Sequence, residues 1–215
     1  MQCIKSALIF AGGSGLVPSC MESVLDNADY VICADSGIAY CHKLGLKAHL
    51  WVGDFDSADF DSYISLPFLE NTEIIKLNPI KDATDTEFAL ECAINRGYTD
   101  ISLIGAVGSR IDHSLANIFL MEKYIRNNVK IRIINENNII HLVSDGTITI
   151  KRGEMKYISV LPLETVKVSN EGFVYPLKNE TMYRYSSRGI SNELTEETGI
   201  IKVTGGSALV IESKD

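Results

Sequence analysis

Hydrophobic residues in the first two-thirds of the chain form short runs rich in Val, Ile and Leu. These runs alternate with stretches in which apolar residues recur at helical spacing. Short strands separated by helices are typical of a parallel sheet with helical crossovers, so this part of the chain is predicted to be α/β. The runs that predict strands are residues 7–10, 30–34, 49–52, 73–77, 101–104 and 130–134.

Two of the intervening stretches are expected to form helices. Residues 86–96 place apolar side chains one turn apart, and Gly97 follows as a residue that commonly ends a helix. Residues 115–125 also carry a mostly apolar face. Asp112 lies just before this second stretch and is a candidate N-cap, because its carboxylate can accept hydrogen bonds from the first backbone N–H groups.

After Asn135 the pattern changes to short alternating runs separated by turn residues, which predicts an all-β domain. Asp145 and Gly146 separate the first two runs and predict a tight hairpin, since both residues tolerate positive φ. We therefore expect an α/β N-terminal domain with a mostly parallel sheet, residues 1–136, followed by an all-β C-terminal sandwich domain, residues 137–215. The predicted strands are residues 139–143, 147–150, 157–161, 166–169, 173–177, 200–203 and 208–211.

Composition narrows the classes of function. The apolar runs are far shorter than the ~20 residues needed to cross a bilayer, and the N-terminus lacks the pattern of a signal peptide. The five cysteines are irregularly spaced without a C-x-x-C pair, which indicates reduced thiols and not a zinc or disulfide framework. A net charge of −8 argues against nucleic-acid binding, which needs clustered Lys and Arg. We expect a cytoplasmic protein that binds neither membranes nor nucleic acid.

Aspartates follow four of the predicted parallel strands. The carboxyl ends of such strands share one edge of the sheet, where open α/β folds bind ligands. Each aspartate alone is explained by a helix cap or a turn, but together they would repel one another unless a cation offset their charge. Oxygen ligands favour Mg²⁺ if phosphates complete its shell. These residues are Asp35, Asp54, Asp56, Asp82, Asp85 and Asp112.

Two glycine-containing loops could bind phosphate beside these carboxylates and the expected metal ion. Residues 11–15 follow the first strand and could present the backbone N–H groups of Gly12 and Gly13 to an anion, although they match neither a P-loop nor G-x-G-x-x-G. The loop after the fifth strand contains Arg110, whose planar guanidinium suits phosphate oxygens. His113 follows in the same loop, where a local structural role is favoured over that of a general base.

The α/β part contains four notable motifs: Ala34-Asp35-Ser36-Gly37, residues 52–57, Asp82-Ala83-Thr84-Asp85 and residues 108–117. In order and spacing they resemble the successive motifs of thiamine pyrophosphokinases. Two segments of the β part, residues 172–177 and 189–193, resemble the thiamine-binding segment of the same family. The chain departs from the family at Ser36, where a second glycine is frequent, and at Tyr175, where tryptophan is frequent.

This resemblance implies a homodimeric enzyme that transfers pyrophosphate from ATP to thiamine, giving thiamine diphosphate and AMP. Residues 1–136 would bind ATP and Mg²⁺, and residues 137–215 would bind thiamine and form the dimer. Thiamine would lie between the catalytic face of one subunit and the β-domain of its partner.

The resemblance and the residue patterns together assign roles to individual positions. The expected metal ligands are Asp54, Asp56 and Asp85, and these join Arg110 and Asp112 as catalytic residues. The expected thiamine contacts are Tyr175, Ser191 and Asn192. The expected ATP-binding residues are Gly12, Gly13, Asp35, Asp82, Thr84, Arg110 and His113.

Two other functions remain open at this stage: a metal-dependent nucleotide phosphohydrolase and a non-catalytic thiamine or nucleotide sensor. The phosphohydrolase would use a similar acidic edge but would not need a separate acceptor domain. The sensor would tolerate the loss of some acids, whereas this chain retains all of them. The sequence also leaves open whether Asp85 or Asp112 handles the proton of the attacking hydroxyl.

Overall fold

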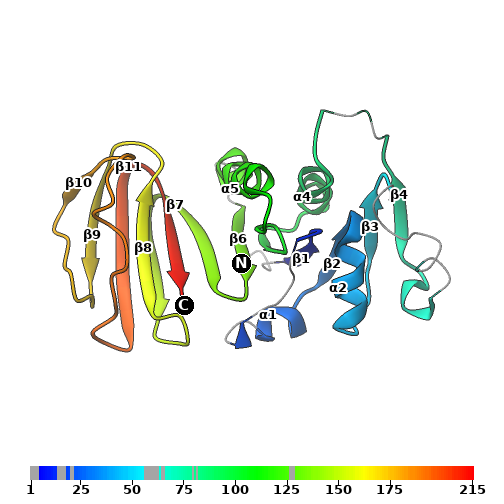
Figure 1. The fold of residues 1–215 in the computed structure, drawn as a ribbon, viewed down its shortest axis with the longest axis horizontal. Helices are drawn as coiled ribbons and strands as arrows, with labels where there is room; N and C mark the ends of the chain where they lie inside the picture. The colour runs from blue at the N-terminus through cyan, green and yellow to red at the C-terminus, as the bar shows by residue number, and fades with distance from the viewer. Residues whose placement is uncertain are drawn as a thin grey trace. The chain divides into compact units, whose positions relative to one another are not determined.

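The structure, a computed structural model, describes residues 5–13, 18–19, 22–55, 63, 66–78, 80, 82–125 and 129–215. The chain divides into two compact units, Met1–Glu136 and Asn137–Asp215 (Figure 1). The first is α/β and the second is built of antiparallel strands, so the predicted fold class is confirmed. Among the described residues, no helix is long and apolar enough to cross a membrane.

The first unit is organised around a parallel sheet with the strand order β6-β5-β1-β2-β3-β4. The chain extends the sheet outward from β1 to β4, then returns to the other side of β1 with β5. This reversal places a topological switch point between β1 and β5, where ligands bind in folds of this type. The strands are β1 (Ser6–Phe10), β2 (Tyr30–Ala34), β3 (Leu50–Gly53), β4 (Glu73–Lys76), β5 (Asp100–Ile104) and β6 (Lys130–Asn135).

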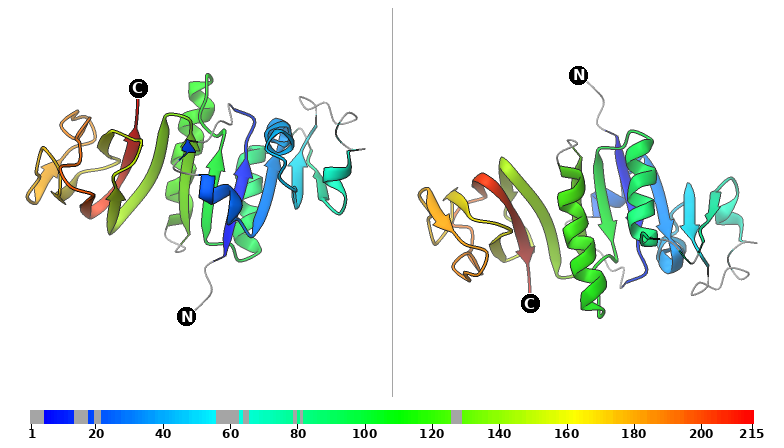
Figure 2. Two further views of the ribbon diagram at one scale, coloured as in Figure 1. Left: turned by 90° about the horizontal axis from the view of Figure 1, so that it is seen from below. Right: turned by 90° about the horizontal axis from the view of Figure 1, so that it is seen from above.

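Helices cover both faces of this sheet. Figure 2 shows α4 (Asp85–Asn95) and α5 (Ile111–Ile125) on one face, and α1 (Glu22–Asp26) and α2 (Ile38–Lys43) on the other. Because both faces are covered, the central strands are apolar along their length, and most side chains of β1, β2 and β5 are buried. Two short 3-10 helices, η2 (Asp35–Gly37) and η3 (Pro67–Leu69), complete the described elements of this unit.

The predicted helices are present, but their N-termini differ from the expectation. Thr84, not a carboxylate, caps α4 by accepting a 3.2 Å hydrogen bond from the Glu87 N–H. The prediction that Asp112 caps the second helix is wrong. The Ser114 N–H donates to the Arg110 carbonyl, so α5 starts at Ile111 and Asp112 lies in its first turn.

The second unit is antiparallel throughout its described strands. The long strands β7 (Asn138–Lys151) and β11 (Thr198–Ser213) pair along nearly their whole length. The first half of β11 also pairs with β9 (Val166–Glu171), and its second half pairs with β8 (Tyr157–Pro162). The short β10 (Glu180–Met182) extends the sheet beyond β9. Side chains from both halves of β7 and β11 contribute to one apolar core.

The hairpin predicted at Asp145-Gly146 is wrong, because β7 continues through both residues. Asp145 adopts a φ of +42°, and its carboxylate accepts a 2.7 Å hydrogen bond from the Gly205 N–H of β11. The pairing register of β11 shifts at the same level, between Val203 and Ser207. A turn-like pair therefore serves here as an irregularity shared by two long strands, which a local sequence pattern does not distinguish from a hairpin.

The strand predicted for residues 173–177 is also absent. Phe173 forms only an isolated bridge with Leu194, and the rest of the segment is irregular. Gly172 before it adopts a φ of +82°. The segment is instead held by side chains, as described below.

Gly37 provides a test of how tightly η2 packs on β1. A Cβ atom at Gly37 would lie 2.0 Å from the Phe10 carbonyl oxygen, so Gly37→Ala must displace backbone. We expect this substitution to lower the free energy of unfolding by about 2–3 kcal/mol, measured by urea denaturation. Gly153→Ala is the control, because a Cβ atom there meets nothing within 4 Å, and should change stability by less than about 1 kcal/mol. Equal effects of the two substitutions would contradict this packing.

Candidate active site

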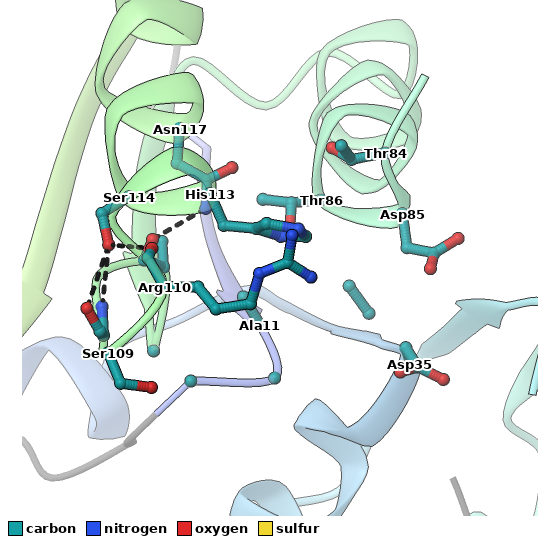
Figure 3. Close-up of a pocket in the computed structure, with 16 residues that line it drawn as sticks. Ala11, Asp35, Thr84, Asp85, Thr86, Ser109, Arg110, His113, Ser114 and Asn117 are labelled. Carbon is teal, nitrogen blue, oxygen red and sulfur yellow. Dashed lines mark hydrogen bonds between the residues drawn. The ribbon is translucent and has the colours of Figure 1, made fainter. Parts of the chain in front are cut away.

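A pocket of about 520 Å³ opens in the first unit at the carboxyl ends of β1, β2 and β5 and the N-termini of α4 and α5 (Figure 3). It therefore lies at the switch point of the sheet. Ten of its lining residues are labelled in Figure 3: Ala11, Asp35, Thr84, Asp85, Thr86, Ser109, Arg110, His113, Ser114 and Asn117.

Backbone hydrogen bonds join the two glycine loops beneath this pocket. The Ala11 N–H donates to the Ile104 carbonyl and the Gly13 N–H to the Gly105 carbonyl, both at 2.8 Å. A Cβ atom at Gly13 would lie 2.3 Å from the Gly105 oxygen, and Gly105 itself has a φ of +71°. Glycine is needed at both positions for this close approach. The Gly13 N–H is thus used within the fold, so Gly13 shapes the pocket but does not offer this donor to an anion.

Asp35 enters the pocket from the end of β2 in an unusual backbone conformation, with a φ of +47°. The indole N–H of the fully buried Trp51 donates a 2.9 Å hydrogen bond to the Asp35 carbonyl. Gly53 allows this packing, because a Cβ atom there would lie 3.1 Å from the Asp35 Cα. Trp51 is therefore a positioning residue that the sequence patterns did not single out.

The N-terminus of α4 contributes Thr84, Asp85 and Thr86 to the pocket. The backbone N–H groups of a helix N-terminus favour negative charge, which suits both a phosphate and the Asp85 carboxylate. Asp82 lies in the preceding loop, is exposed, and is not among the pocket-lining residues.

Arg110 and Asp112 form a bidentate ion pair at the start of α5. The Arg110 Nε lies 3.2 Å from Oδ1 and Nη2 lies 2.6 Å from Oδ2 of Asp112. This pair, assisted by the His113 backbone, lowers the pKa of Asp112 to about 2. The side chains of Arg110 and His113 point into the pocket (Figure 3), whereas Asp112 does not line it.

Ser114 and Asn117 are pocket-lining residues to which the sequence patterns assigned no role. Both side chains are buried and hydrogen bonded to the loop between β5 and α5. A signal was available, because two polar residues three positions apart interrupt the inward face of a helix that otherwise buries Met121 and Tyr124.

The predicted metal ligands are only partly placed. Asp85 lines the pocket, Asp54 is half-buried at the end of β3 outside its lining, and Asp56 lies outside the described residues. Within the described residues, no group of three or more His, Cys, Asp or Glu side chains is arranged to hold a metal ion. Mg²⁺ commonly uses one or two carboxylates together with substrate phosphates and water. Asp35 and Asp85 supply two such carboxylates to one pocket, so the donor chemistry fits Mg²⁺.

The second unit has a small pocket of about 40 Å³ beside Tyr175, whose side chain is 67% exposed. Asn192 also lines this pocket, while Ser191 does not. Ser191 has a φ of +57°, and its N–H donates to the buried Ser159 hydroxyl at 3.0 Å.

The Asn192 amide holds the Tyr175 backbone. Its Oδ1 accepts from the N–H groups of Tyr175 and Glu193, both at 3.0 Å, and its Nδ2 donates to the Tyr175 carbonyl at 2.8 Å. The buried Asn170 donates to the same carbonyl at 3.2 Å and accepts from the Leu177 N–H at 2.6 Å. These bonds fix the base of Tyr175, so its exposed ring is presented from an ordered backbone.

The Arg110–Asp112 pair predicts a change in titration. In Arg110→Gln, the pKa of Asp112 should rise from about 2 toward the ordinary value of about 3.9, because the guanidinium is the main cause of the shift. The folded-state pKa is the lower one, so the stability contributed by this pair is present above about pH 4 and lost as the pH falls through about 2. The measurement is an NMR titration of the Asp112 carboxyl carbon. Arg184→Gln, at an exposed arginine of the other unit, is the control, and an unchanged Asp112 in Arg110→Gln would refute the assignment.

Comparison with known proteins gives one consistent result. Residues 21–133 match the model of "Thiamin pyrophosphokinase, catalytic domain", and residues 146–210 match "Thiamin pyrophosphokinase, vitamin B1 binding domain". The thiamine pyrophosphokinase of Bacillus subtilis is 32% identical over 223 residues, which cover 99% of this chain and 100% of the relative.

Solved structures agree with the sequence matches. The crystal structure of the Bacillus subtilis thiamine pyrophosphokinase gives a TM-score of 0.86 at 29% identity, covering 98% of this chain and all of the other. That of a thiamin pyrophosphokinase family protein from Enterococcus faecalis gives 0.84 at 30% identity, covering 98% and 99%. The two matched domains follow one another in the order of the two units described above, and this chain belongs to the thiamin pyrophosphokinase family.

Proposed function

We propose that this protein is a thiamine diphosphokinase, which transfers the pyrophosphoryl group of ATP to the primary hydroxyl of thiamine and releases AMP. One observation carries the proposal. The unit that matches the catalytic domain of the family contains a pocket with phosphate-binding chemistry, and the unit that matches the vitamin B1 binding domain presents an exposed aromatic side chain.

The triphosphate of ATP is proposed to lie in the pocket at the switch point. The volume of this pocket, about 520 Å³, is in the range of small-molecule binding sites. Arg110 would bind phosphate oxygens through two N–H groups, and the N-terminus of α4 with the Thr84 hydroxyl would bind others. The guanidinium has further N–H groups besides the two that pair with Asp112, and the pair is exposed, so Arg110 can bind phosphate with or without giving up Asp112.

The reaction would proceed by attack of the thiamine hydroxyl on the β-phosphorus, with AMP as the leaving group. Most of the acceleration would come from positioning and from charge stabilisation by Arg110. Of the two candidates for the hydroxyl proton, Asp85 is favoured. Asp85 lines the pocket, whereas Asp112 does not.

Mg²⁺ is proposed as the cofactor, with Asp54, Asp56 and Asp85 as ligands and Asp35 as a further pocket carboxylate. When bound, the ion would offset negative charge on the phosphates. The role of these carboxylates is to hold it beside the triphosphate and so relieve their own repulsion.

Thiamine is proposed to contact Tyr175, whose ring can stack on the cationic thiazolium or the pyrimidine. Ser191 would contact thiamine as well, while Asn192 would act mainly through the Tyr175 backbone. We further propose a cytoplasmic homodimer in which thiamine lies between the pocket of one subunit and the Tyr175 surface of its partner.

The product pattern tests the reaction directly. Purified protein with ATP, thiamine and MgCl₂ should form AMP and thiamine diphosphate in equal amounts, separated by ion-exchange chromatography, and excess EDTA should stop the reaction. ADP with thiamine monophosphate would sink the proposal. Nucleotide breakdown that does not depend on thiamine would instead indicate a phosphohydrolase.

The shared site predicts complementation between two inactive variants, Asp85→Asn and the double variant Tyr175→Ala with Asn192→Ala. After co-refolding, a mixed dimer would combine an intact pocket from one chain with an intact Tyr175 surface from the other. With random pairing about half of the dimers would be mixed, and each mixed dimer would contain one intact active site of its two. The preparation should therefore recover about a quarter of normal turnover. No recovery in dimers shown by mass spectrometry to be mixed would overturn the shared site but not the reaction.

A further inference from the structure

The loop between β5 and α5, residues 105–110, carries much of the phosphate chemistry but has no secondary structure of its own beyond turns and bends. It supplies Gly108, Ser109 and Arg110 to the pocket. Its first residue is tied to the neighbouring loop, because the Gly105 carbonyl accepts a hydrogen bond from the Gly13 N–H. The other five residues have contacts of a different kind.

Two buried side chains of α5 provide these contacts. The Asn117 Nδ2 donates a 2.7 Å hydrogen bond to the Ala106 carbonyl. The Ser114 hydroxyl accepts from the Gly108 N–H at 3.0 Å and lies 2.9 Å from the Arg110 carbonyl, to which it can donate. Ser114 and Asn117 are only 5% and 6% exposed, so both side chains are largely shielded from water.

These bonds act at three points along the loop, at Ala106, Gly108 and Arg110. The Arg110 carbonyl is held twice, by the backbone N–H and by the hydroxyl of Ser114. Its guanidinium, in contrast, is exposed and pairs with Asp112. The backbone of Arg110 is therefore held in place, while its guanidinium is exposed to solvent. This arrangement suits a side chain that must reach a phosphate group from a defined position.

We infer that Ser114 and Asn117 are positioning residues for ATP, which hold the 105–110 loop in its phosphate-binding conformation. They reach the nucleotide through the loop backbone and Arg110, not by chemistry of their own. This inference rests on the proposed function, because it takes the ligand of the pocket to be ATP. Loss of the Asn117 amide leaves the carbonyl of the buried Ala106 without this donor, and loss of the Ser114 hydroxyl leaves the Gly108 N–H without its side-chain acceptor. Either change removes a contact that holds the loop in this conformation.

The test compares Ser114→Ala with Ser102→Ala. Ser102 is also buried in the first unit, at 1% exposure, and accepts a 2.7 Å hydrogen bond from the Arg132 Nε, away from the loop. ATP affinity is measured by titration calorimetry without thiamine, so that no turnover is needed. Ser114→Ala should weaken ATP binding on the order of tenfold or more, while Ser102→Ala leaves it unchanged at a similar loss of thermal stability. Equal ATP affinities of the two variants would overturn the inference.

A second variant separates loss of the hydrogen bond from loss of volume. Asn117→Leu keeps a similar side-chain volume and adds no charge to the pocket but cannot donate to the Ala106 carbonyl, and it should also weaken ATP binding. Arg110→Ala then tests whether Ser114 acts on ATP through Arg110. In the Arg110→Ala protein, the further substitution Ser114→Ala should have a clearly smaller effect on ATP affinity, because the side chain that Ser114 positions is absent. Additive effects would refute action through Arg110.

The same data distinguish failure of the inference from failure of the proposed function. An unaltered protein that binds ATP but does not form thiamine diphosphate would refute the reaction, while the Ser114 comparison would still decide the inference. An unaltered protein that does not bind ATP would refute both.

Discussion

The whole pocket depends on the close contact between two loops that leave the sheet at its switch point. The hydrogen bonds from Ala11 to Ile104 and from Gly13 to Gly105 join segments almost a hundred residues apart. No side chain fits between these backbones, so glycine at 13 and 105 is a steric requirement. Because the loops meet here, the ends of β1, β2 and β5 and the N-termini of two helices surround one cavity.

Charge is the second constraint on this site. Asp35 and Asp85 line a pocket that we propose accepts a polyanion, and the helix N-terminus and Arg110 are groups that favour one. The Arg110–Asp112 pair keeps the guanidinium at the pocket while no ligand is bound. Its exposed position limits what it contributes to stability and leaves it free to rearrange. The carboxylates explain why a hard cation belongs in the proposed mechanism.

Both units use the same device for irregular segments that carry function. In the first unit, Ser114 and Asn117 bind the backbone of the 105–110 loop, and in the second, Asn170 and Asn192 bind the backbone around Tyr175. Side-chain amides and hydroxyls take the place of a strand ladder where the chain must be irregular. The functional side chains then project from backbones that are held in place.

The sequence by itself determined the kind and order of most strands and of the two longest helices, since apolar periodicity reports which faces of a strand or helix are buried. Of the six aspartates predicted to converge at the carboxyl edge of the parallel strands, Asp35 and Asp85 line one pocket. Tertiary structure decided three further features. The strand β7 continues through Asp145, Thr84 caps α4, and the Asn192 amide binds the Tyr175 backbone. Each of the two β-unit outcomes depends on a contact between residues distant in sequence, and the cap depends on the backbone conformation that the surrounding fold imposes. A local pattern identifies which residues can make such bonds, but only the folded chain selects the partner.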